Sequence, residues 1–107
     1  MSGIIPGGRA ESLADLLALQ PNSIASRVIA RSPGGNVTLF TMDAGEGLSE
    51  HTTPFDALVV VLEGAVHIQV GEGSGVVRAG QVLRMPANVP HALKAEDPAR
   101  MLLVMLK

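Results

Sequence analysis

The chain of 107 residues contains no cysteine. Disulfides, thiolate metal sites and cysteine nucleophiles are therefore excluded, and any metal has to be bound by histidine, carboxylate or water. A basic block is also missing, since eight basic and ten acidic residues give a formal net charge of -2. Without lysines and arginines gathered along a phosphate backbone, nucleic acid is not an expected partner.

Long hydrophobic runs are absent as well. The longest apolar stretches, around residues 57–62 and 101–106, are far shorter than the roughly 20 residues that a membrane-spanning helix needs. No signal-peptide pattern opens the sequence. We therefore expect no membrane partner and a cytoplasmic location.

Charged residues are scarce, at 17% of the chain against an average of about 25%. Hydrophobic residues make up 47%, and a chain of this length has room for one core. Part of the apolar surface is therefore expected to be covered by another subunit, which predicts a homodimer.

The sequence predicts a flexible N-terminal arm at residues 1–9, followed by one domain at residues 10–107. The arm, MSGIIPGGR, is rich in glycine and proline, a composition typical of loosely held termini. No later segment has the composition of a linker that would divide the chain.

A short helix is expected between Ser12 and Leu19, because three leucines recur there at helical spacing. Ser12 stands where its hydroxyl can cap the first turn, and Asp15 stands where a capping box places its acid. Pro21 disfavours helical geometry at the residue before it. The helix is expected to cover one end of a sheet.

From residue 23 onward, short runs of alternating apolar and polar residues are separated by turns rich in glycine and proline. This pattern predicts an all-β antiparallel sandwich or barrel, since the repeated helical segments of a parallel sheet are missing. The segment GEGSG at 71–75 is expected to be a loop. The expected strands span residues 23–30, 36–42, 57–62, 66–70, 76–78, 82–85, 91–94 and 100–106.

Two stretches share one arrangement, a glycine followed by a histidine on or beside a strand. The first runs from Gly45 to Gly64 and contains His51, and the second runs from Gly80 to Ala95 and contains His91. The two imidazoles can meet only if the sheet folds back on itself.

The first stretch resembles the first motif of the cupin superfamily, the small RmlC-like barrels. That motif runs glycine, five residues, His-x-His, three or four residues, glutamate, six residues, glycine. Gly45, His51 and Gly64 fall in register, whereas Thr53 stands in place of the second histidine and Ala57 in place of the glutamate.

The second stretch resembles the second cupin motif, which runs glycine, five residues, Pro-x-Gly, two residues, histidine, three residues, asparagine. Gly80, Pro86 and His91 match it, whereas Asn88 replaces the glycine and Ala95 replaces the asparagine. Asparagine tolerates left-handed backbone geometry better than other non-glycine residues, so Asn88 is the mildest departure.

The resemblance implies a double-stranded β-helix, or jelly-roll barrel, that holds a small organic ligand. It further implies one divalent metal, Zn, Ni, Fe, Mn or Cu, on His51 and His91. Because the usual carboxylate is missing, such a metal is expected to be weakly held, and the two-His-one-carboxylate face of iron oxygenases is lost. The metal motif is thus degenerate.

Three functions stay open at this point. The family resemblance implies a metal-dependent oxygenase, isomerase or decarboxylase acting on a small polar molecule. The alternative is a non-catalytic small-molecule-binding or sensory cupin without metal. A purely structural module would have its cavity filled with side chains.

Residues two apart on a regular strand share a face, so His51, Thr53, Phe55 and Ala57 are expected to point the same way. Together with Met85 they are expected to line the ligand pocket. Glu50 and Asp56 have the opposite parity and point inward only if a bulge intervenes. The hydroxyl of Thr53 is expected either to orient a water or to bond to backbone.

Three further predictions concern single side chains. His67 shares a strand face with Gln69 and is expected to be exposed. Arg84 is expected either to bind a substrate carboxylate with its planar fork or to lie on a solvated strand face. Met85, Met101 and Met105 are expected to fill the core.

Overall fold

The computed structural model describes residues 3–107, and nearly all of its regular structure is β-strand. The all-β prediction is thereby confirmed. One short helix, α1 (Leu13–Leu16), precedes the strands. These are β1 (Ile24–Ser32), β2 (Gly35–Met42), β3 (Gly47–His51), β4 (Asp56–Glu63), β5 (Ala65–Val70), β6 (Gly73–Arg78), β7 (Val82–Met85), β8 (His91–Ala95) and β9 (Ala99–Leu106).

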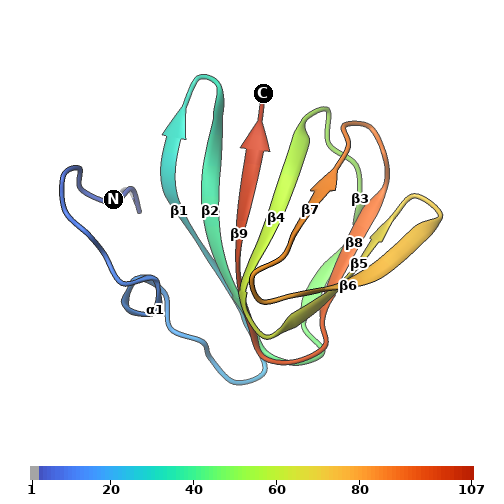
Figure 1. Cartoon of the computed structure of the whole chain (residues 1–107), viewed down its shortest axis with the longest axis horizontal. Helices are drawn as coiled ribbons and strands as arrows, with labels where there is room; N and C mark the ends of the chain where they lie inside the picture. Colours follow the sequence, from blue (N-terminus) through green and yellow to red (C-terminus); the bar gives the residue numbers. More distant parts are fainter. Residues whose placement is uncertain (1–2) are drawn as a thin grey trace.

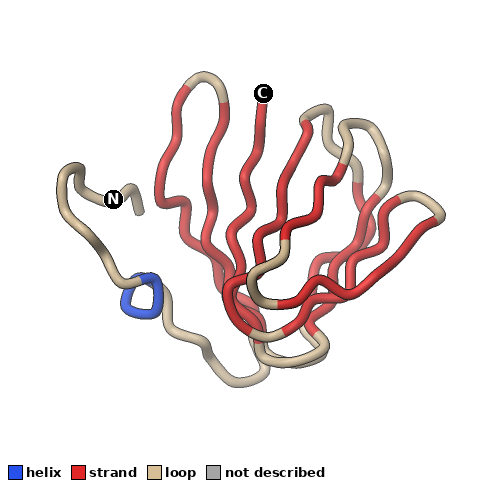
Figure 2. The backbone as a smooth tube through the Cα atoms, in the orientation of Figure 1, coloured by secondary structure: helices blue, strands red, loops and turns tan. Residues whose placement is uncertain are grey.

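The strands form two sheets. Sheet A has the order β1-β2-β9-β4-β7 and sheet B the order β3-β8-β5-β6. Neighbouring strands pair antiparallel throughout, and the chain passes repeatedly from one sheet to the other, as in a jelly roll. The strands converge at one end and diverge at the other (Figures 1 and 2). We call the divergent end the mouth; it carries loops 52–55 and 86–90, the β1–β2 hairpin and the chain's C-terminus.

The core lies between the two sheets because alternate residues of each strand face inward. On β4, for example, Ala57, Val59 and Val61 are buried, as are Val66 and Ile68 on β5. The predicted methionine filling is confirmed. Met85 and Met101 are buried, and the partly buried Met105 packs against the core.

The helix is shorter than the sequence predicts, and the predicted capping box is wrong. The Ser12 hydroxyl makes no cap hydrogen bond. Its backbone carbonyl accepts instead from the amides of Asp15 and Leu16, at 3.0 and 3.1 Å. After a single turn the chain is already extended at Leu17.

Side chains of sheet A explain why the helix stops. The guanidinium of Arg27 donates to the Leu16 carbonyl, that of Arg100 to the next carbonyl, and the Thr41 hydroxyl to the carbonyl of Ala18. In a longer helix the Leu16 and Ala18 carbonyls would accept from amides one turn later, whereas the Leu17 carbonyl would meet Pro21, which has no amide hydrogen. The segment therefore lies on the outer face of sheet A, whereas the sequence placed it at a sheet end.

The predicted flexible arm, residues 1–9, falls partly outside the described residues, since positions 1 and 2 are not described. Within it, the Gly3 carbonyl accepts from Arg27 Nε at 2.8 Å, and the Ile5 amide donates to the Ile29 carbonyl at 3.0 Å. The arm thus runs beside β1, and its mobility stays a prediction.

The β5–β6 hairpin is tighter than expected. Val70 pairs with Gly73, so the turn contains two residues, Gly71 and Glu72. Residues 73–75 belong to β6 rather than to the predicted loop. Gly75 lies opposite Ile68 and contributes no side chain to that pair. The ladder forms although three of the five residues at 71–75 are glycine.

Strand β4 is buried on one face only. Its inward residues are buried, but Leu58 and Val60 on the outer face are only half-buried. Beside them on β7, Val82 is 60% exposed.

Within residues 3–107, no helix is long and apolar enough to cross a membrane.

Candidate functional site

The two motif histidines meet at the mouth. His51 on β3 lies directly opposite His91 on β8. Their Nε2 atoms are 3.1 Å apart, and the ring centroids are 4.4 Å apart with an interplanar angle of 75°. His91 is buried and His51 is exposed. The prediction that the folded sheet brings both imidazoles together is confirmed.

A β-bulge aims His51 inward. Leu48 pairs with Leu93 and His51 with His91, so three steps along β3 match two steps along β8. Leu48 and His51 therefore both face the interior despite their odd spacing. Glu50 lies within the bulge and stays exposed, so the bulge turns a histidine, rather than a carboxylate, into the site.

The expectation of one regular strand through His51, Thr53 and Phe55 is wrong. Strand β3 ends at His51, and residues 52–55 form a loop that contains Pro54, which has no amide hydrogen for a ladder. The Thr53 hydroxyl donates to the Phe55 carbonyl at 3.1 Å. Of the two expectations for this hydroxyl, the bond to backbone is the one the structure shows.

The second histidine loop, residues 86–90, is fixed to the first. Asn88 has a φ of 64°, the left-handed geometry expected where the motif has glycine. Its amide donates to the Thr53 carbonyl at 2.8 Å. The carboxylate of Asp56 accepts from the Ala87 amide at 2.9 Å. The two loops thus form one connected side of the mouth.

Asp56 and Arg84 face away from the histidines. The Asp56 carboxylate lies 3.4 Å from the Arg84 guanidinium, and both side chains are substantially exposed. Arg84 therefore lies on the solvated face of sheet A, as one of the two expectations had it. His67 lies on the outer face of sheet B between Val76 and Lys94, half-buried rather than fully exposed.

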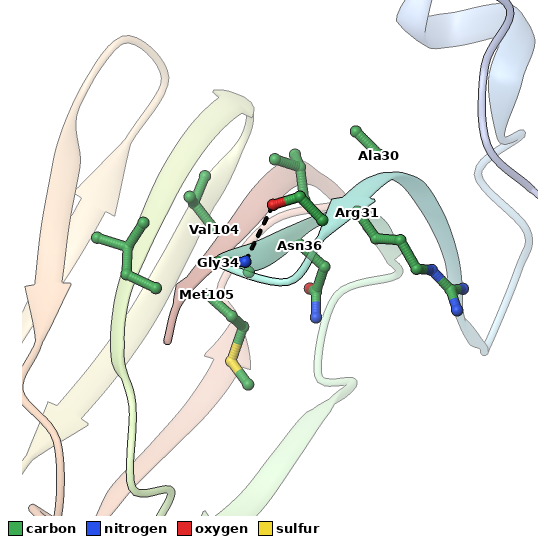
Figure 3. Close-up of a pocket in the computed structure, with 10 residues that line it drawn as sticks. Ala30, Arg31, Gly34, Asn36, Val104 and Met105 are labelled. Atoms are coloured by element: carbon green, nitrogen blue, oxygen red, sulfur yellow. Dashed lines mark hydrogen bonds between the residues drawn. The ribbon is translucent and has the colours of Figure 1, made fainter.

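Opposite sheet B, one row of residues crosses the inner face of sheet A at the mouth. We call it the mouth row. Backbone pairing aligns its members across all five strands, and the predicted lining residues Ala57 and Met85 belong to it: Arg31, Asn36, Met105, Ala57 and Met85. Figure 3 shows Asn36 and Met105 on one side of the sheet and Val104 and Ala30 on the other.

Arg31 and Asn36 were not identified from the sequence. They flank the turn of the β1–β2 hairpin, whose pairing places them opposite each other. This local pairing could be inferred from the sequence. Their place in the same row as Ala57 depends on the pairing of β2 with β9 and of β9 with β4, which the sequence does not reveal. Phe55, also predicted to line the pocket, lies in loop 52–55 with Lys107 Nζ 5.5 Å from its ring centroid.

The hydrogen bonds of the two imidazoles fix their tautomers. His51 Nδ1 lies 2.7 Å from the Ser49 carbonyl, and His91 Nδ1 lies 3.2 Å from the Val89 carbonyl. A carbonyl oxygen only accepts, so each Nδ1 carries the proton of the neutral ring. Both Nε2 lone pairs then face each other, and a cation between them, a proton or a metal, relieves their repulsion.

Burial lowers the pKa of His91 below its usual value of 6.5, and the neighbouring charge of His51 lowers it further. The Val89 carbonyl acts in the opposite direction. Near neutral pH the interior imidazole is therefore held in its uncharged form, which is the form that binds a metal.

This shift predicts a pH dependence of stability. Since the folded pKa of His91 is depressed, the unfolded chain binds the proton first as the pH falls below about 6.5. The free energy of unfolding is expected to decrease from there until the folded pKa is reached, and to keep its full His91 contribution above pH 6.5. Urea unfolding between pH 5 and 8 measures it. His91→Gln should flatten this part of the profile, and His67→Gln should not; equal slopes in all three proteins would contradict the assignment.

The two Nε2 atoms fit a metal. Two nitrogens about 2.0–2.1 Å from one zinc ion, at tetrahedral to octahedral angles, lie roughly 2.9–3.4 Å apart, and the observed separation is 3.1 Å. Within residues 3–107, no cluster of three or more histidine or acidic side chains is present. The chain can thus supply two ligands, and solvent or a bound ligand has to supply the rest.

Comparison with known proteins agrees with the fold. A family model described as the cupin domain matches residues 38–105. The solved structure of a conserved protein of unknown function from Streptococcus pyogenes is 32% identical and has a TM-score of 0.90, with 100% of this chain and 96% of that chain covered. A cupin superfamily protein from Desulfitobacterium hafniense is 28% identical with a TM-score of 0.87, covering 95% and 94%.

A third relative differs in length. The cupin 2 conserved barrel domain protein from Leptotrichia buccalis is 35% identical with a TM-score of 0.82. The match covers 88% of this chain but 46% of that one, so this chain spans about half the length of that relative. No curated protein matches the chain.

Proposed function

Since the chain belongs to the cupin family, we propose that it binds a small organic ligand at the mouth together with one divalent metal on His51 and His91. The observation that carries this proposal is the pair of facing Nε2 atoms 3.1 Å apart, in rings whose Nδ1 atoms both face backbone carbonyls. Both Nε2 atoms can therefore bind the same metal ion. Zn, Ni, Fe, Mn and Cu are the candidate ions.

His91, His51 and Ala57 have separate roles in this proposal. His91 supplies a buried neutral donor, and His51 supplies a donor at the solvent side. Ala57 stands where a carboxylate would compete for the metal, so a coordination position is left to the ligand. A bound metal there would act as a Lewis acid that polarises the ligand's oxygen; by family resemblance, an enzyme built on it would be an oxygenase, isomerase or decarboxylase.

Metal content tests the proposal directly. Protein purified without a histidine tag and dialysed against each candidate ion is expected to retain close to one ion per chain. His51→Ala and His91→Ala are each expected to reduce that content. A trace content that neither substitution changes would remove the metal from the proposal.

The second candidate is a metal-free binding or sensory cupin. It is favoured by the absence of a third metal-binding side chain within residues 3–107. Thermal-shift screening with small carboxylates, with and without chelator, separates the two candidates. Stabilisation that survives the chelator supports the metal-free protein, whereas stabilisation that needs the ion supports the metal site.

A homodimer is a further proposal, and the outer face of sheet A supports it. This face carries half-buried Leu58, Val60, Leu102 and Val104 beside the exposed Val82. Adjoining them at the β1–β2 hairpin is a groove of about 340 Å³, lined by Val37 and Val104 of the outer face and also by members of the mouth row; part of its lining is labelled in Figure 3. A second copy would cover this continuous apolar surface.

The cytoplasmic location expected from the sequence likewise stays a prediction.

Light scattering at micromolar concentration tests the homodimer. We expect twice the chain mass for the unchanged protein and a single chain mass for Leu102→Glu, which puts a charge in the middle of the outer face. Val76→Glu, on the outer face of sheet B, is the matched control and should keep the dimer mass. A monomer mass for the unchanged protein would refute the proposal.

A further inference from the structure

A hollow lies where the two sheets part at strands β6 and β7. These are edge strands of sheets B and A, and the turn at 79–81 connects them. In the part of the chain that the structure describes, they do not pair with each other. Between them is a hollow of about 210 Å³, lined by Ile68, Val70, Gly73, Ser74, Gly75 and Leu83.

The hollow adjoins the histidine pair. Val70 on β5 pairs with His91 on one side and with Gly73 on the other. Cross-strand partners present their side chains on the same face of a sheet, so Val70 faces the interior beside His91. Neighbouring strands lie about 4.8 Å apart. The hollow therefore begins one strand from His91 and ends two strands away, at roughly 10 Å.

The lining of the hollow is apolar. Among the described residues, its inward side chains are those of Ile68, Val70 and Leu83. Leu83 lies on the inner face of sheet A because it pairs with the buried Val59. Ser74 points to the outer face of sheet B, since alternate residues of a strand point to opposite faces. The hollow thus presents hydrocarbon and glycine backbone, and no ionisable group.

The two glycines of β6 are not required by the backbone. Neither Gly73 nor Gly75 has a positive φ. Among the described residues, a Cβ atom at Gly75 would have no atom within 4 Å, and one at Gly73 only the Val70 carbonyl oxygen at 3.6 Å. Gly47 on β3 differs, because a Cβ atom there would overlap the Leu93 carbonyl. Glycine weakens a strand interior and often marks a close approach of a ligand.

We propose that this hollow binds an uncharged apolar group of the ligand, such as a phenyl ring or a short branched alkyl chain. We call it the tail pocket, and we infer that Gly73 and Gly75 determine the size of the group. The inference rests on the proposed function, because the polar end of the ligand lies at His51 and His91. A cavity of about 150 Å³ with an aliphatic and aromatic lining binds benzene, so about 210 Å³ admits a phenyl ring.

Hydroxamic acids with one head and two different tails test the proposal. Acetohydroxamate carries a methyl group and benzohydroxamate a phenyl ring, and both offer the same two oxygens to Zn²⁺ on the histidine pair. In Zn²⁺-loaded protein, benzohydroxamate is expected to bind at least about tenfold more tightly, because its ring leaves water. It is also expected to shift the NMR signals of the Ile68, Val70 and Leu83 methyl groups.

Substitutions on β6 measure the size limit. Gly75→Val and Gly73→Val are expected to remove the tenfold preference for benzohydroxamate and to leave the affinity for acetohydroxamate unchanged. Gly75→Ala, the smaller change, should reduce the preference in part. Urea unfolding verifies that each variant is folded; valine suits a strand better than glycine does, so the midpoint should not fall.

Ser74→Val is the matched control, since it adds the same side chain to the outer face of the same strand. It should keep the preference for benzohydroxamate. Equal binding of the two hydroxamates by the unchanged protein, or a preference that survives both valine substitutions, would refute the tail pocket while leaving the proposed function intact. If acetohydroxamate does not bind either, the proposed function itself is refuted, and the tail pocket with it.

Discussion

His91→Ala is expected to lower the affinity for Zn²⁺ or Ni²⁺ about 100-fold or more, because loss of an outer hydrogen-bond partner of a metal ligand already costs about 10- to 100-fold. His91 is the buried donor of the pair, and its replacement leaves one exposed imidazole on the solvent side. A single imidazole on a strand end holds a dication no better than any surface histidine. Isothermal titration calorimetry on untagged protein measures the change.

The matched control for this experiment is His67→Ala. His67 is the third histidine of the chain and lies on the outer face of sheet B, so its removal should leave the affinity unchanged. Circular dichroism and thermal unfolding verify that both variants fold. An unchanged affinity in folded His91→Ala would show that the metal binds elsewhere.

Gly64→Ala is expected to lower the free energy of unfolding by about 3 kcal/mol or more. Gly64 forms the turn between β4 and β5 with a φ of 76°, which alone costs a residue with a side chain about 1–2 kcal/mol. A Cβ atom at this position would also overlap the backbone carbonyl of Pro98. Backbone cannot rotate away as a side chain does, so the turn has to shift.

Gly80→Ala separates the two causes. Gly80 is the corresponding glycine of the second motif, has a φ of 85°, and has no atom within 4 Å of the position of a Cβ. Only the conformational cost remains there, about 1–2 kcal/mol. Chemical denaturation of both variants gives the difference. Equal losses would mean that the contact with Pro98 is relieved at no cost.

The positions of most strands along the chain were predictable because they depend on local patterns. Alternation along residues 66–70, for example, defines a strand through its period of two, and turns rich in glycine and proline mark where strands end. The left-handed Asn88 was predictable for the same reason, since its conformation is a property of one residue in a turn.

The direction of His51 was not predictable in the same way. It depends on the bulge between Leu48 and His51, and a bulge is defined by the partner strand, forty residues further along. The prediction of an inward His51 was confirmed, but the regular strand on which it rested is absent. The role of Thr53 as a neighbour on that strand is lost with it.

The mouth row depends on contacts at still longer range. Asn36 and Ala57 share a face only because β9, the last strand of the chain, inserts between β2 and β4. Alternation shows which residues of one strand share a face, but not which strands lie side by side. Arg84 lies within the second motif but on the outer face of sheet A, whereas the arginine on the inner face, Arg31, lies in β1.

The bond between the two histidine loops bears on how a molecule passes in and out of the barrel. Asn88 joins loop 86–90 to loop 52–55, and Asp56 holds the neighbouring amide, so the two loops that flank the imidazoles are tied to each other. The other side is the β1–β2 hairpin. Lys107 connects the two, since its amide donates to the Gly34 carbonyl and its ammonium lies over Phe55. For the ligand proposed above, exchange is therefore expected to depend on the hairpin and on Lys107 rather than on the two joined histidine loops.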